Sequence, residues 1–262
     1  PGQNKMNMVF DSTAIHSTQR FANRIQSGLF PPYKKWCRLE PGNDIPADRR
    51  AEVQAALDIY LDKMFTILRQ SNFDLAMGEF LLDLCVGTAV MLIQPGDDIN
   101  PIQFTPVPQY LIALEEGPYG TVDNVYRKYK IRAESITRTF PDANIPETLQ
   151  NLINEKPSEM IELLEAVIVD AERKDFCYHI IYEKTRDELV FRRMDSTPWI
   201  VARYMKIPGE VFGRGPLVTA LPDVKTLNKT LELLLKNASI ACAGVYTAAD
   251  DGVINPSNIR IT

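Results

Sequence analysis

The sequence predicts an α+β fold with N-terminal helices, a mixed or antiparallel β region, and one long C-terminal helix. Apolar residues recur at helical spacing up to Gly87, and from Thr88 the period changes to two while the residues become β-branched and aromatic. Residues 217–243 then return to helical spacing. Helices and strands that occupy separate stretches of a chain are typical of α+β architecture.

Three helices are predicted in the first third of the chain. Capping side chains at residues 11–13 begin the first helix, and the Gly and Pro residues at 28–32 end it. A second helix is expected at about 47–71, and a third covers FDLAMGEFLLDLC up to Gly87.

The β region is expected to start with two hairpins. AVMLIQ and IQFTPV flank the turn PGDD, and LIALEE and TVDNVYRKYKI flank the turn GPYG. Short helical pieces at 133–139 and 146–155 interrupt the sheet. Four further strand candidates complete it: LLEAVIVDA, FCYHIIYE, ELVFRRM and WIVARYMKI.

A glycine- and proline-rich turn, PGEVFGRGP, precedes the last helix. Gly213 and Gly215 are expected to adopt unusual backbone angles, and Pro216 suits the first position of a helix, where its missing N–H is not needed. Pro222 is expected to kink the helix or to move its start toward Leu221. The predicted rigid corner consists of Gly213, Arg214, Gly215 and Pro216.

Two faces can be distinguished on this last helix. The apolar face, called the seam below, consists of Ala220, Val224, Leu227, Leu231, Leu234, Ala238 and Ala241. A polar stripe at the same spacing consists of Lys225, Asn228, Lys229, Glu232, Lys236 and Ser239. The seam is suited to packing on protein and the stripe tolerates water. Taken alone, this pattern also fits an ordinary amphipathic helix packed on its own domain.

Composition limits the classes of protein that fit. The chain has 262 residues, 45% of them hydrophobic and 24% charged, which is typical of one large or two smaller globular domains. No run approaches about 18 uncharged apolar residues, so no membrane span is predicted. A net charge of −5 argues against tight binding of nucleic acid through its phosphates, but allows a protein that surrounds DNA without holding it.

No catalytic, cofactor or metal site is predicted. With only His16 and His179, a Ser/His/Asp hydrolase or a multi-histidine metal enzyme is hard to assemble. The glycines of GEVFGRGP lack the Gly-Lys-Ser/Thr ending of a phosphate-binding loop. The acidic pairs at 97–98, 115–116 and 250–251 are typical of solvated turns. The basic and aromatic run at 127–130 fits a nucleic-acid-binding strand, but a solvent-facing edge strand is favoured.

Four segments in order resemble the head-to-tail connecting (portal) protein family of tailed bacteriophages, particularly the short-tailed type. They are DSTAIHSTQRFANRIQSGLFPPYKKWCRLEPG, NFDLAMGEFLLDLCVGTAVMLIQ, GTVDNVYRKYKI and EVFGRGPLVTALPDVKTLNK. The resemblance spans nearly the whole chain, and its most specific piece is the GRGP turn with the helix that follows. It implies a non-enzymatic structural subunit of a ring, usually of twelve copies, at one vertex of the capsid.

The resemblance also divides the chain into parts. Residues 1–207 would form a wing-like α+β domain, 208–243 the corner and a stem helix, and 244–262 the start of a clip-like region of a truncated chain. The seam residues Val224, Leu227, Leu231, Leu234 and Ala238 are then candidates for packing between subunits. Lys225, Lys229 and Lys236 are candidates for facing the channel or DNA.

The implied partners are those of a portal at the virion vertex, assembled in the host cytoplasm. They are other copies of the chain, the ATP-driven terminase motor, capsid and scaffold proteins, a tail adaptor, and the double-stranded DNA that is packaged and later ejected. No cofactor and no membrane are implied. Two alternatives remain open from the sequence: a magnesium-dependent enzyme acting on nucleic acid through scattered carboxylates, and a soluble adaptor module without a channel.

Overall fold

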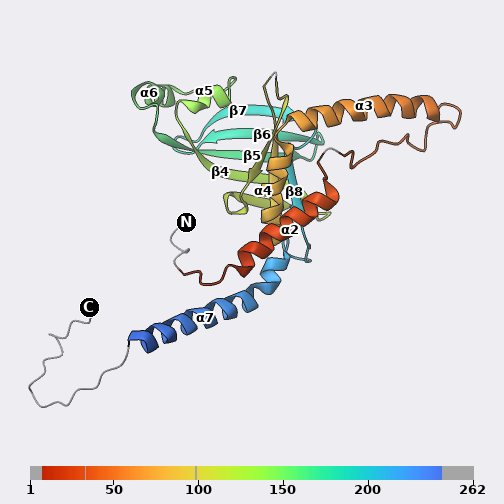
Figure 1. Cartoon of the computed structure of the whole chain (residues 1–262). Coiled ribbons are helices and arrows are strands. Elements are labelled where there is room, and N and C mark those ends of the chain that lie inside the picture. Colours follow the sequence, from red (N-terminus) through yellow and green to blue (C-terminus); the bar gives the residue numbers. More distant parts are fainter. Residues whose placement is uncertain (1–7, 33, 98, 244–262) are drawn as a thin grey trace, which may run out of the picture. The chain divides into compact units, whose positions relative to one another are not determined.

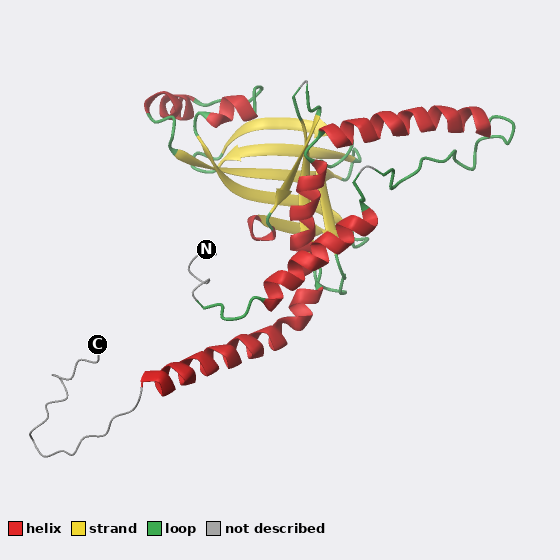
Figure 2. Ribbon diagram, viewed as in Figure 1, coloured by secondary structure: helices red, strands yellow, loops and turns green. Residues whose placement is uncertain are grey.

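The computed structural model describes residues 8–32, 34–97 and 99–243, which form an α+β fold (Figures 1 and 2). The chain divides into two compact units. The larger unit is His16–Thr219, and the smaller one comprises, among the described residues, 8–15 and 220–243. The predicted clip-like region, 244–262, lies outside the described residues.

The three predicted N-terminal helices are confirmed. They are α2 (Thr13–Leu29), α3 (Arg50–Gln70) and α4 (Phe73–Val86). Asn72 separates α3 from α4, and its side-chain amide hydrogen-bonds both backbone groups of Phe104, with the two bonds at 2.7 and 2.9 Å. The Asn72 side chain thus pairs with the backbone of Phe104 as a neighbouring strand would. This pairing holds the break between the two helices against the strand that contains Phe104.

A three-stranded antiparallel sheet packs against α4. It has the order β2-β1-β8, with β1 at Thr88–Pro95, β2 at Ile102–Val107 and β8 at Trp199–Arg203. Phe73, Phe80 and Met91 belong to the hydrophobic cluster between this sheet and the helices. No pattern in the sequence indicates that the last strand, WIVAR, joins the first hairpin rather than the strands that precede it.

The other five strands form a second antiparallel sheet in sequence order (Figure 1). They are β3 (Ile112–Glu116), β4 (Val122–Arg132), β5 (Met160–Asp170), β6 (Asp175–Tyr182) and β7 (Asp187–Met194). A short 3₁₀ turn, η1 (Gln109–Leu111), leads into β3. The helices α5 (Ser135–Thr139) and α6 (Glu147–Glu155) place Ile136 and Leu149 in the core of this sheet.

Strand β1 joins two hydrophobic cores because both of its faces are buried. Val90 and Leu92 pack in the core of the five-stranded sheet, whereas Ala89 and Met91 pack in the core beneath α4. Side chains of a strand alternate between faces, so a strand covered on both sides reads as a continuous apolar run. This explains the run AVMLI in the sequence.

The predicted edge position of the basic run at 127–130 is only partly correct. Strand β4 lies between β3 and β5 and is therefore inside the sheet. However, β3 pairs with β4 only as far as Arg127, so Lys128 and Lys130 have a strand neighbour on the β5 side alone.

Candidate subunit-packing helix and its glycine corner

The GRGP corner is attached to the junction between α4 and β1 by hydrogen bonds that its backbone N–H groups donate. Gly215 N–H donates to the carbonyl of Val86 (2.9 Å), and Gly213 N–H donates to the hydroxyl of the fully buried Thr88 (2.8 Å). Tyr204, just after β8, donates its N–H to the carbonyl of Gly87 (2.9 Å). The corner therefore continues the backbone pairing of the small sheet beyond its last strand.

Glycine is needed here because two backbones lie in contact. A Cβ at Gly215 would lie 2.2 Å from the carbonyl oxygen of Cys85, and a Cβ at Gly87 would lie 2.0 Å from that of Gly213. Among these glycines only Gly87 has a positive φ, of 155°. The left-handed backbone angles that glycine allows are therefore not used at Gly213 and Gly215, and close approach is the reason for both glycines.

The other two residues of the corner act locally. Arg214 pairs with Glu210 on its own turn, with Nε 2.9 Å from the carboxylate, and its N–H donates to the carbonyl of Met205. Pro216 is the first residue of α7 (Pro216–Ala243), as predicted. Pro222 lies inside this helix, so of the two alternatives, a kink or a start moved toward Leu221, the moved start is excluded.

A largely buried arginine side chain connects the corner segment to the five-stranded sheet. Arg203, at the end of β8, donates to the Glu116 carboxylate (2.9 Å), to the carbonyl of Gly120 (2.7 Å) and to that of Val211 (3.3 Å). Lys206 also pairs with Glu116 and bonds the Gly120 carbonyl. Hydrogen bonds from Lys206, and then Arg203, lower the pKa of Glu116. No sequence pattern indicated this link.

Helix α7 has 28 residues and is therefore about 42 Å long. None of its residues is fully buried. In the seam, Val224 and Leu231 are half-buried, whereas Leu227 and Leu234 are 42% and 58% exposed. An apolar face of this length is thus left largely uncovered by the described residues.

The three candidate lysines of the polar stripe differ in their partners. Glu232 pairs with both Lys229 (2.9 Å) and Lys236 (2.5 Å), and these hydrogen bonds, first that of Lys236, lower its pKa. Lys225 has no ion pair within residues 8–243 as far as they are described. Among the described residues, Lys225 is therefore the candidate lysine without a carboxylate partner, and Lys229 and Lys236 share one.

Asn228, expected only as a member of the polar stripe, binds backbone. Its Oδ1 accepts hydrogen bonds from the N–H groups of Phe10 (2.7 Å) and Asp11 (3.3 Å), and its Nδ2 donates to the carbonyl of Met8 (3.0 Å). We call Met8–Asp11 the strap. Asp11 also caps α2 by accepting from Thr13 N–H (3.1 Å), as predicted. Contacts across more than two hundred residues leave no periodic signal in the sequence.

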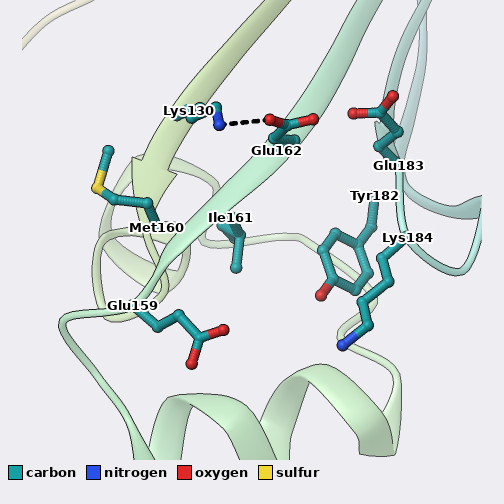
Figure 3. Close-up of a pocket in the computed structure, with 8 residues that line it drawn as sticks. All are labelled: Lys130, Glu159, Met160, Ile161, Glu162, Tyr182, Glu183 and Lys184. Atoms are coloured by element: carbon teal, nitrogen blue, oxygen red, sulfur yellow. Dashed lines mark ion pairs between the residues drawn. The ribbon is translucent and has the colours of Figure 1, made fainter.

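Charged side chains on the five-stranded sheet neutralise one another (Figure 3). Lys130 lies 2.5 Å from the Glu162 carboxylate beside a pocket of about 290 Å³, and Lys128 pairs with both Glu162 and Glu183. These hydrogen bonds, that of Lys130 first, lower the pKa of Glu162 to about 2. The basic run of β4 thus binds glutamates of neighbouring strands, an arrangement suited to stabilising a sheet surface.

A buried carboxylate lies on the same strand, β5. Glu165 is 1% exposed, accepts a hydrogen bond from the Tyr178 hydroxyl (2.7 Å) and lies 3.4 Å from Nη1 of Arg127. Arg127 in turn stacks on the ring of Tyr129. Burial raises the pKa of Glu165, and the bonds from Tyr178 and Arg127 only partly oppose this effect. A charged residue within the apolar run LLEAVIVD is the sequence signal that could have revealed this group.

Other side chains that could bind a metal ion or act in catalysis are already paired with protein groups. Asp170, Asp175 and Cys177 lie close enough to bind a metal ion, but Arg193 occupies the two carboxylates, at 3.2 and 2.8 Å. His179 pairs with Glu188 across two strands, at 2.6 Å. None of the described helices is long and apolar enough to cross a membrane.

Comparison with known proteins agrees with the resemblance expected from the four segments. The family model described as bacteriophage head to tail connecting protein matches residues 1–262. A probable portal protein of Bordetella phage BPP-1 is 25% identical over 86% of this chain and 43% of its own length. The portal proteins of Enterobacteria phage T3 and Escherichia phage T7 are 22% and 19% identical, each over 95% of this chain and 46% of the relative. The chain thus spans less than half the length of these curated relatives.

We predict that Gly215→Ala destabilises the larger unit by about 2 kcal/mol or more, because the new Cβ meets a backbone oxygen that cannot rotate away. The measurement is the free energy of unfolding in urea. Gly42→Ala is the matched control, since nothing lies within 4 Å of a Cβ at Gly42. Equal stability of both variants would contradict the close-contact role of the corner.

We also predict opposite pH dependences for two carboxylates of β5. The pKa of Glu165 is raised, so its contribution to stability is present below about pH 4.5 and lost as the pH rises through the folded-state value. Between about pH 4.5 and the higher pKa of Glu165 in the folded state, Glu165→Gln should therefore gain stability relative to the wild type. The gain should be about 1.4 kcal/mol for each pH unit.

Glu162 serves as the matched control for this prediction. Its pKa is lowered to about 2, so its contribution is present above about pH 4.5 and lost as the pH falls toward 2. Glu162→Gln should be less stable than the wild type at neutral pH and should approach it in acid. Urea unfolding across this range checks both variants, and parallel curves would refute the assignment.

Proposed function

The chain belongs to the bacteriophage head to tail connecting protein family, and we propose that it is the wing and stem part of a portal subunit. In this proposal copies of the subunit form a ring at the capsid vertex. The ring encloses the channel through which double-stranded DNA is packaged and later ejected. The observation that carries the proposal is the uncovered seam of α7, in a chain whose relatives are named portal proteins.

The uncovered seam supports assembly because exposed apolar faces are rare on monomers. The seam residues Leu227 and Leu234 are 42% and 58% exposed on α7. Large apolar patches of this kind mark interaction sites. A closed ring needs one patch of each subunit to meet a different patch of the next, repeated around the axis. The proposed packing residues are Val224, Leu227, Leu231, Leu234 and Ala238.

The charge of the helix suits a channel wall that does not hold DNA. Glu232 partly neutralises Lys229 and Lys236, and the chain has a net charge of −5. Strong cationic contacts to every phosphate would hold the duplex, whereas a weakly charged wall lets it slide. We propose that Lys225 makes the main screened contact with DNA, and that Lys229 and Lys236 contribute less.

We propose the remaining assignments as the resemblance implies them. Residues 1–207 would form a wing, 208–243 the corner and a stem helix, and 244–262 the start of a clip. The proposed role is mechanical and structural, with other copies, the terminase motor, capsid and scaffold proteins and a tail adaptor as partners. The packaging energy would come from the motor, so this chain needs neither a catalytic group nor a cofactor.

We predict that Leu231→Asp and Leu234→Asp each prevent ring formation by the full-length protein, because they place a charge in the proposed subunit contact. Native mass and negative-stain images measure assembly, and circular dichroism checks that the β region stays folded. Ser239→Asp, on the polar stripe, is the matched control and should still form rings. Normal rings from both leucine variants would show that the seam does not face a neighbour.

We further predict that Lys225→Ala weakens the salt dependence of DNA binding by assembled rings more than Lys229→Ala does. Each lost phosphate contact should reduce the slope of log affinity against log salt by about 0.9. Fluorescence anisotropy of a labelled duplex at several salt concentrations measures this slope. Identical slopes for the wild type and Lys225→Ala would place Lys225 away from the DNA.

A further inference from the structure

We propose that the strap, Met8–Asp11, covers part of the α7 seam only in the unassembled subunit, and that the α7 helix of a second copy displaces it when the ring forms. This inference rests on the proposed function. It identifies an assembly-linked switch at the N-terminal end of the described chain. The smaller unit contains the strap, Asn228 and the seam, so the hydrogen bonds that hold the strap lie within one compact unit.

The strap is held mainly through one side chain. The Asn228 amide bonds the N–H groups of Phe10 and Asp11 and the carbonyl of Met8, which is the donor and acceptor pattern of a neighbouring strand. All three hydrogen bonds are made to backbone groups of the strap and none to its side chains. Met8 and Val9 remain 70% and 48% exposed, so the strap itself buries little apolar surface.

The strap is bound at the border between the polar stripe and the seam. Asn228 belongs to the stripe, but Val224 lies four residues before it and Leu231 three residues after it, so both seam residues are its direct neighbours on the helix surface. Both apolar residues are half-buried, whereas the seam residues Leu227 and Leu234 are exposed. The seam residues beside the strap are therefore better covered than these two leucines.

A neighbouring helix and the strap cannot occupy this face together. Packed helices lie about 8–10 Å apart, and their side chains fill that space, so no room remains for a third backbone. A strap of four residues is long enough to cover only the seam residues beside Asn228, but the seam continues to Ala238. A second copy of α7 has the length and the repeat to cover all of it. Full coverage favours the helix over the strap.

Displacement need not disturb α2. Asp11 accepts hydrogen bonds from both the N–H and the hydroxyl of Thr13, so the end of the strap stays attached to the cap of the helix. The segment that leaves is Met8–Phe10.

Hydrogen exchange of the full-length protein tests this inference at two amides, those of Phe10 and Asp11. In Leu234→Asp, which serves as the unassembled reference, both amides should exchange slowly because Asn228 accepts their hydrogen bonds. In wild-type rings the Phe10 amide should exchange at least about tenfold faster. Equal protection of this amide in rings and in the reference would overturn the inference. A wild-type protein that forms no rings would instead contradict the proposed function.

Asn228→Ala provides a second, independent test, with Ser239→Ala as the matched control on the same stripe. Asn228→Ala should remove the protection of Phe10 in the unassembled background and should form rings at a lower protein concentration than the wild type, since no strap has to leave. Ser239→Ala should change neither property. If Asn228→Ala remains folded but forms no rings, the strap contributes to the interface, and displacement is refuted.

Discussion

The structure depends on one close contact between backbones, at the place where α4 ends and the GRGP corner begins. Gly87 and Gly215 bring two chain segments so near that neither position has room for a side chain. Hydrogen bonds from Gly213 and Gly215 then join the corner to Thr88 and Val86. Helix α7 starts at the next residue, Pro216, so the geometry of its first turn is set by the core of the larger unit.

Two asparagines in this chain perform the same physical task. Asn72 pairs with both backbone groups of Phe104, and Asn228 pairs with the backbone of the strap. A side-chain amide offers one acceptor and two donors, so it can replace a strand where no strand is present. At Asn72 the bound backbone belongs to a sheet covered by other elements, and at Asn228 it belongs to an exposed segment. The first pairing is therefore structural, and the second is open to competition.

Local periodicity predicted most elements of the fold, because helices and antiparallel hairpins are defined by neighbours in sequence. The bounds of α2, α4 and α7 differ from the predictions by only a few residues. Long-range pairing was not predictable in this way. Three features depend on residues far apart in the chain. They are the pairing of β8 with β1 in the smaller sheet, the burial of Glu165, and the hydrogen bonds between Asn228 and the strap. The corner glycines were predicted, but their physical reason is close approach rather than backbone angles. The role of the seam between subunits stays a prediction.

The hydrogen bond between Gly213 and Thr88 has a consequence for the order in which the chain acquires its structure. These residues are 125 positions apart, and the chain between them forms both sheets. Contacts of such sequence separation form late, because the intervening chain must first be ordered. During synthesis the whole β region leaves the ribosome before the corner can close. The hydrogen-bonded corner before α7 is thus a mark of a completed larger unit, and a chain that stalls or misfolds earlier lacks it.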